Sequence, residues 1–306
     1  IDSLNIDRLG LFGYNYTGIA STLKYNGYDC DARIICNDPS LNFLFQGSFV
    51  TSQKTGNTAY QFYANLGNAD LNSMNLDKRG RSRIRLTANA NFTHRKEGDI
   101  LGRIDLGDIV LENKDGIYKI GNVSLASQSN EGNYRLKLNS DFADITYSGS
   151  AFITGFFTDM QNVALKRELP ALYKKPSYQW KGNSYNFIFN FHNSMDLMAF
   201  AMPGLYIADS TYFNANIDKS GLVKAKLSSP RIAYDGYYLK GIRADFHNAD
   251  SALQCNLSSD EIRLATLSVL NNDFKVFAKE NHIGLGFTYD NKSNLENRGE
   301  LYIRSD

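Results

Sequence analysis

The sequence predicts an all-β protein built on one long, repetitive sheet, and three observations support this. Along most of the 306 residues, apolar and polar side chains alternate with a period of two, as in strands with one apolar and one polar face. Tyr and Phe occur 19 times each but Pro only 5 times, which favours strands. Turn dipeptides such as Asn26-Gly27, Asp115-Gly116 and Asp235-Gly236 separate the alternating runs. We therefore expect strands to hold more than roughly 45% of the residues, against about 20–25% in an average globular protein.

The alternating runs follow one another along the chain, about twenty in all. Residues 30–36, 84–92, 134–138, 187–191 and 283–287 are examples. Successive side chains of a strand point to opposite faces, so each run gives its strand an apolar face and a face of charged or amide groups. This pattern predicts an antiparallel sheet with one wet face.

A weak repeat relates three segments, which begin at Leu9, Ile109 and Ile232. Each reads as a strand, a short turn, a tyrosine-bearing strand with a glycine, a polar turn, an alternating strand, an Asp-containing turn and another alternating strand. The glycines that the three segments share are Gly18, Gly121 and Gly241. A unit repeated at this interval indicates an elongated sheet rather than a closed globule.

Two segments break the strand pattern, and the first is Thr158 to Lys174. Thr158 and Gln161 have the spacing of a capping box, which predicts a helix start at this point. Pro170 cannot continue a helix, so the regular helix should end near Glu168 or Leu169.

A second, shorter helix is predicted over Asn193 to Ala201, capped by Asn193 or Ser194 and closed by Pro203. Both helices are expected to fill an end or a gap of the sheet. Between them, Lys174-Lys175-Pro176-Ser177 is the best candidate for a linker. The predicted division is therefore a first β segment, residues 1–173, which ends in a helix, and a second, residues 174–306, which continues the sheet.

Charge and motifs exclude several classes of function. With 33 basic and 32 acidic residues the net charge is +1, so the sequence lacks the basic excess of a nucleic-acid binder. The four histidines, His94, His192, His247 and His282, are scattered and lack metal-ligand spacing. No nucleophile elbow, P-loop, zinc-protease motif or EF-hand loop is present. We expect no enzyme activity, no metal and no cofactor.

The candidate functional surface is the apolar face itself. In a sandwich two such faces would bury each other, whereas in a folded single sheet they would line an open trough. A trough of Phe, Leu and Ile without polar groups suits acyl chains better than a soluble metabolite. The residues predicted to line this lipid groove on one concave side are Phe43, Phe45, Ile84, Leu86, Phe92, Leu136, Leu138, Phe187, Phe189, Phe191, Leu253, Ile283, Leu285 and Phe287.

Five segments and the Leu169-Pro170 helix ending together resemble, in order and spacing, the TamB branch of the AsmA-like proteins of Gram-negative envelopes. The five segments are Asn68 to Leu76, Ile100 to Leu111, Ser140 to Gly149, Met202 to Asp218 and Ser229 to Ile242. The resemblance implies a β-taco, a long U-shaped sheet with a hydrophobic inner groove. It also implies a periplasmic location, with an inner-membrane anchor helix that is not present in this chain.

The same resemblance implies phospholipid transport from the inner to the outer membrane and a role in outer-membrane biogenesis. The translocation and assembly module to which this family belongs pairs such a protein with an outer-membrane assembly barrel. This chain looks like an internal segment, so any contact with that barrel would use regions outside it. The family has no catalytic motif to carry over.

Two alternative functions stay open. One is a scaffold for outer-membrane protein assembly, whose sheet edge receives client strands by β-augmentation. The other is a carbohydrate-binding β-solenoid or sandwich. Exposed tyrosines and the single Trp180 beside a carboxylate cleft would favour the carbohydrate alternative.

Overall fold

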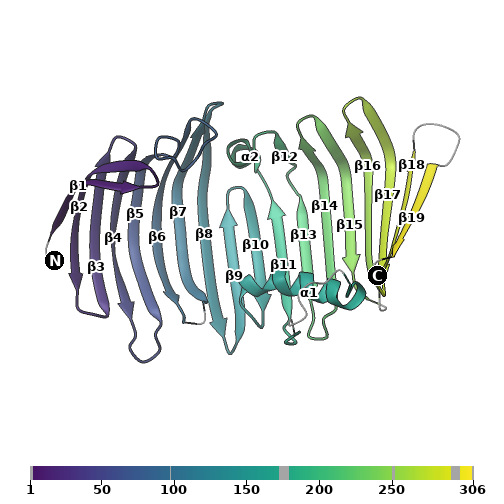
Figure 1. Ribbon diagram of the computed structural model, residues 1–306, viewed down its shortest axis with the longest axis horizontal. Coiled ribbons are helices and arrows are strands. Elements are labelled where there is room, and N and C mark those ends of the chain that lie inside the picture. Colours follow the sequence, from purple (N-terminus) through teal and green to yellow (C-terminus); the bar gives the residue numbers. More distant parts are fainter. Residues whose placement is uncertain (1–2, 97, 172–178, 250–251, 291–296, 305–306) are drawn as a thin grey trace. The chain divides into compact units, whose positions relative to one another are not determined.

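Strands hold 67% of the chain in the computed structural model, which confirms the prediction of an all-β protein. The structure describes residues 3–96, 98–171, 179–249, 252–290 and 297–304. The strands belong to one open antiparallel sheet of 19 strands, accompanied by two short helices (Figure 1). The chain divides into two compact units: unit 1 is residues 1–128 and 137–142, and unit 2 is residues 129–136 and 143–306.

Unit 1 contains seven complete strands, β1 to β7, and most of β8, and each pairs antiparallel with the next along the chain. The turn residues between them bring consecutive strands side by side, as hairpins require. The strands are β1 (Leu4–Leu11), β2 (Tyr14–Tyr25), β3 (Asp29–Asp38), β4 (Leu41–Thr51), β5 (Thr58–Asp70), β6 (Ser82–His94), β7 (Ile100–Asn113) and β8 (Ile117–Asn130). The next strand, β9 (Asn133–Ser140), has residues in both units.

Unit 2 continues with strands that are antiparallel to their neighbours. They are β10 (Ala143–Gly149), β11 (Tyr185–Phe191), β12 (Leu205–Ile207), β13 (Tyr212–Ile217), β14 (Val223–Tyr234), β15 (Tyr237–His247), β16 (Leu253–Leu264), β17 (Leu267–Lys279), β18 (His282–Asp290) and β19 (Asn297–Arg304). Strand β11 pairs with β10 and β13, and β14 pairs with β13 along one half and β12 along the other. From β14 to β19 each strand pairs with the next.

The helices lie where the sequence places them, but the predicted start of the first helix is wrong. Helix α1 spans Phe156–Glu168 after a short 3-10 turn, and Gly155 stands at its N-cap without a side-chain capping bond. Because Thr158 is already inside the helix, the predicted capping box does not form. The predicted end, next to Pro170, is confirmed, and helix α2 spans Met195–Ala201 with Ser194 as its N-cap residue.

Helix α1 lies across one end of the strands of unit 2, against their apolar face (Figure 1). Its first residue, Phe156, is completely buried. The side chains that cluster with Phe156 come from four neighbouring strands, β10, β11, β13 and β14, and are Tyr147, Tyr185, Phe187, Ala215, Ile217 and Val223. The helix therefore covers part of the sheet, as predicted, and supplies the second layer that this part of the face needs for burial.

The three glycines of the sequence repeat occupy equivalent places in the sheet. Gly18, Gly121 and Gly241 lie inside β2, β8 and β15 with φ values of 63°, 82° and 59°, in the left-handed region. An acidic residue follows each glycine after 20, 20 and 19 positions, namely Asp38, Asp141 and Asp260. A Cβ on Gly121 or Gly241 would collide with the carboxylate of Asp141 or Asp260. A Cβ on Gly18 would instead meet the backbone carbonyl of Asn37. The repeat is thus a repeated left-handed glycine within a strand, closely approached by a residue of the following strand or of the turn after it.

The predicted division between residues 173 and 174 falls on a segment outside the described residues, as does the linker Lys174 to Ser177. That division stays a prediction. The boundary between the two compact units lies within residues 129–142, around β9. There, residues 129–136 belong to unit 2 and residues 137–142 to unit 1.

Candidate functional site

The apolar face of unit 1 is set by strand register. Residues directly opposite each other in neighbouring strands point to the same side of a sheet. One row of such partners crosses β3 to β8 and consists of Ile34, Phe45, Ala64, Ala88, Leu106 and Val123. Five predicted groove residues lie on this side, and they are Phe43, Phe45, Ile84, Leu86 and Phe92. Each of the five is half-buried, and whether they line a lipid groove stays a prediction.

Five aromatic rings form a continuous group on this face, which we call the aromatic group. Its members are Phe45, Phe49, Tyr60, Phe62 and Phe92, with neighbouring ring centroids 4.8–6.3 Å apart. Of these five residues, only Phe45 and Phe92 are among those predicted from the sequence to line the groove. The period of two at residues 60, 62 and 64 was the signal that could have found Tyr60 and Phe62.

No helix packs on the aromatic group in the part of unit 1 that the structure describes. Both helices belong to unit 2, and the described part of unit 1 contains strands and turns only. All five aromatic side chains are half-buried rather than buried, because a single layer of sheet leaves one side of each ring without a packing partner.

In unit 2 seven predicted groove residues also share one face. The alternating strand β11 places Phe187, Phe189 and Phe191 on the same side, and register connects that side to Phe287 through β13 to β18. The other three residues on this side are Leu253, Ile283 and Leu285. Phe187 and Leu253 are only 7% and 8% exposed, because they pack in the two clusters that contain residues of α1.

The last two predicted residues, Leu136 and Leu138, lie two positions apart on β9 and are half-buried. Leu136 packs against the core beneath α1. Trp180, the residue that would favour a sugar site, also packs against this core, and its indole N–H donates a hydrogen bond to the Lys219 carbonyl at 3.0 Å. Trp180 therefore contributes to packing against the core, and the carbohydrate alternative stays a prediction.

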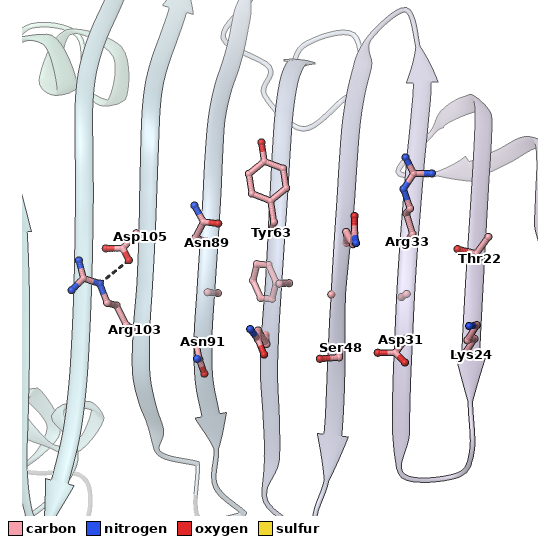
Figure 2. A pocket seen from close by; sticks show the side chains of 16 residues that line it. Thr22, Lys24, Asp31, Arg33, Ser48, Tyr63, Asn89, Asn91, Arg103 and Asp105 are labelled. Atoms are coloured by element: carbon pink, nitrogen blue, oxygen red, sulfur yellow. Dashed lines mark hydrogen bonds and ion pairs between the residues drawn. The ribbon is translucent and has the colours of Figure 1, made fainter.

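A hollow of about 1120 Å³ lies on the opposite, polar face of unit 1, and the sequence analysis did not foresee it (Figure 2). We call it the polar hollow. Its polar lining residues are Thr22, Lys24, Asp31, Arg33, Gln46, Ser48, Gln61, Tyr63, Asn89, Asn91, Arg103 and Asp105. Arg103 Nε donates to Asp105 Oδ2 at 2.7 Å, and this hydrogen bond holds the pKa of the Asp105 carboxyl below its usual value.

The polar face of unit 2 has a smaller hollow of about 480 Å³, and its charges are paired across strands. Lys226 Nζ lies 3.7 Å from the Asp245 carboxylate, and Arg243 lies 2.6 Å from Asp260. Lys275 Nζ is 3.6 Å from the carboxylate of Asp273 on the same strand. Exposed pairs of this kind contribute little stability, about 0–1 kcal/mol each, but they occupy the polar groups of this face.

Two further observations bear on the kind of site. Among the described residues, no three His, Cys, Asp or Glu side chains come together as a possible set of metal ligands. Within the same ranges, no helix has the length and apolar character needed to cross a membrane.

Comparison with protein-family models, with curated proteins and with solved structures found no match to this chain.

Proposed function

We propose that this chain is a periplasmic segment of a TamB-like envelope protein that shields phospholipid acyl chains against the apolar face of its sheet. The role proposed is transport of phospholipid from the inner to the outer membrane and outer-membrane biogenesis. The observation that carries the proposal is the aromatic group of unit 1, which is half-exposed and on which no helix packs in the described part of unit 1.

A hydrocarbon chain can supply the apolar packing partner that this face of unit 1 lacks. A packed sandwich would bury the face against a second sheet, at a gain of about 25 cal/mol per Å² of apolar surface removed from water. An acyl chain lying on the rings gives the same gain, and it requires no polar group from the protein. A contiguous exposed apolar patch commonly marks such an interaction site.

The rest of the proposal follows from the resemblance. An anchor helix outside this chain would hold the protein at the inner membrane, and other regions outside the chain would reach the outer-membrane assembly barrel. This chain would contribute a stretch of the path for the lipid. Unit 1 is the better candidate for lipid contact, because α1 already covers part of the apolar face of unit 2.

The second candidate function is a scaffold that receives client strands by β-augmentation. In the described part of the chain β19 pairs with β18 only, and Leu301, Tyr302 and Ile303 on it are exposed. A strand with an open edge offers unpaired N–H and C=O groups to another strand.

The experiment that tests lipid shielding compares two neighbouring substitutions on β5. Phe62→Asp places a carboxylate in the aromatic group, and Gln61→Asp places one on the opposite face. Native mass spectrometry of the purified chain is expected to detect phospholipid on the unmodified protein and on Gln61→Asp, and much less on Phe62→Asp. The melting temperature of Phe62→Asp should change little, because the new carboxylate keeps contact with water.

Two results would count against lipid shielding. One is an unmodified chain that carries no phospholipid after purification in detergent-free buffer. The other is a Phe62→Asp variant that fails to fold, which would make this face an ordinary packed core.

A further inference from the structure

The polar hollow of unit 1 is crossed by two parallel rows of polar side chains. One row runs from β2 to β8 through direct cross-strand partners, and the other follows the same strands two residues away. The first row is Thr22, Arg33, Gln46, Tyr63, Asn89, Asp105 and Ser124. The second row is Lys24, Asp31, Ser48, Gln61, Asn91 and Arg103.

The centre of the hollow is made of amides with free hydrogen-bonding groups. Gln46, Gln61, Asn89 and Asn91 occupy the three middle strands and are all exposed. In the part of the chain that the structure describes, none of these four side chains has a hydrogen-bond partner. Each amide offers two N–H donors and one carbonyl acceptor. In unit 2, by contrast, charged pairs take up the corresponding face.

We propose that the polar hollow binds a linear, uncharged oligosaccharide that lies across the strands, between the two rows. The strands are about 4.8 Å apart and the rows are separated by two residues, about 7 Å. An extended sugar chain carries hydroxyl groups along both edges, with a repeat comparable to this strand spacing. It would therefore meet a donor or acceptor on either side at each strand.

Tyr63 gives the hollow an aromatic surface for a sugar ring. Its side chain is 37% exposed and stands beside the amides in Figure 2. The apolar faces of sugar rings pack on aromatic rings, and the phenol O–H adds a hydrogen bond at the edge.

The charges of the hollow favour an uncharged ligand. The charged residues that line the hollow are three cationic ones, Lys24, Arg33 and Arg103, and two acidic ones, Asp31 and Asp105. Arg103 is engaged by Asp105, and Lys24 is the direct cross-strand partner of Asp31. The surplus of one positive charge is too small to bind a polyanion through its phosphates or sulfates.

The test measures binding of fluorescent linear hexasaccharides of β-1,4-linked glucose and N-acetylglucosamine to the full chain. A single-stranded oligonucleotide serves as the charged competitor. We expect saturable binding of at least one uncharged sugar, little affected by salt. Tyr63→Ala should weaken it about tenfold or more, because one packed partner is lost. The matched control is Tyr28→Ala, which removes an exposed tyrosine outside the hollow and should leave the dissociation constant unchanged.

The proposal fails if no uncharged hexasaccharide saturates the protein at millimolar concentration. It also fails if Tyr28→Ala is as harmful as Tyr63→Ala, or if the oligonucleotide binds more tightly and salt abolishes its binding. Because the acyl-chain proposal concerns the other face of the sheet, phospholipid binding by the same preparations distinguishes failure of one proposal from failure of the other.

Discussion

Asp38, the last residue of β3, connects several residues of the first repeat by hydrogen bonds. Its buried carboxylate accepts hydrogen bonds from Tyr14 Oη at 2.6 Å, from Thr17 N and Oγ1 at 2.9 and 2.8 Å, and from Ser40 N at 2.9 Å. Burial alone would raise the pKa of Asp38, but these hydrogen bonds outweigh it and lower the pKa below the usual value. A carboxyl whose folded pKa is lowered contributes stability above its unfolded pKa and loses it as the pH falls through the folded pKa.

Replacement of Asp38 by Asn should therefore have a pH-dependent cost. At pH 7 we expect Asp38→Asn to lower the free energy of unfolding by about 2 kcal/mol, because the amide cannot accept all four hydrogen bonds. The difference from the unmodified chain should shrink as the pH falls below about 4, where the Asp38 carboxyl becomes protonated in the unfolded chain before it does in the folded protein. Urea unfolding at pH 7 and pH 3 measures this. Asp31→Asn, an exposed carboxylate in the same strand, is the control, and an Asp38→Asn cost that does not vary with pH would contradict the account.

Gly121 is required for the bend of β8. Gly121→Ala should destabilise the fold by about 1–3 kcal/mol, because φ is 82° and the new methyl group meets the Asp141 carboxylate. The double variant Gly121→Ala/Asp141→Ala keeps the backbone strain but removes this collision. Gly286→Ala, where no atom lies within 4 Å of the added Cβ, is the neutral control. Equal stability of Gly121→Ala and Gly286→Ala in thermal unfolding would refute a role for the bend.

Phe156 is the most deeply buried ring that helix α1 contributes to the core of unit 2. Phe156 has 0% exposure, whereas its neighbour Phe157 is 54% exposed. We expect Phe156→Ala to cost about 3–5 kcal/mol, because it leaves a cavity against Tyr185 and Phe187. Phe157→Ala should cost less than about 1 kcal/mol. Chemical denaturation of both variants measures the difference, and similar costs for the two would mean that α1 is not part of the core.

The open edge of β19 predicts self-association. Leu301, Tyr302 and Ile303 are all more than half exposed beside an edge that is unpaired in the described residues. We expect Ile303→Lys to shift the chain toward monomer in analytical ultracentrifugation, since a charge on an edge opposes strand addition. Leu267→Lys is the control, because β17 has neighbours on both sides. If the two variants sediment alike, the β19 edge is not the contact.

Alternation in the sequence predicts the strands and the two faces of each unit, because side-chain direction in a strand is a local property. Strand register places Phe43 and Ile84 on one face of the sheet, as their alternation predicts, because the apolar pattern of each strand helps to set its pairing. The start of α1 was not predictable in this way. It depends on the burial of Phe156 against strands distant in sequence, not on a capping side chain. The polar hollow was not predicted for a similar reason, since it is lined from six strands and so depends on their mutual pairing rather than on alternation within one strand.

At the scale of the whole molecule, the two faces of unit 1 have opposite chemistry over the same strands. One face carries five contacting aromatic rings, and the other carries amides and charges in a hollow. A single sheet of this kind can hold an apolar ligand and a polar ligand back to back. We propose that hydrocarbon lies on the aromatic side only.

Site-specific photo-crosslinking along β5 tests this claim most directly. A photoreactive amino acid is placed in turn at positions 60, 61, 62 and 63, and the protein is irradiated in cells that contain labelled phospholipid. The account predicts crosslinks to phospholipid at Tyr60 and Phe62 and none at Gln61 and Tyr63, because successive side chains point to opposite faces. Crosslinks of equal yield at all four positions, or none at Tyr60 and Phe62, would contradict it.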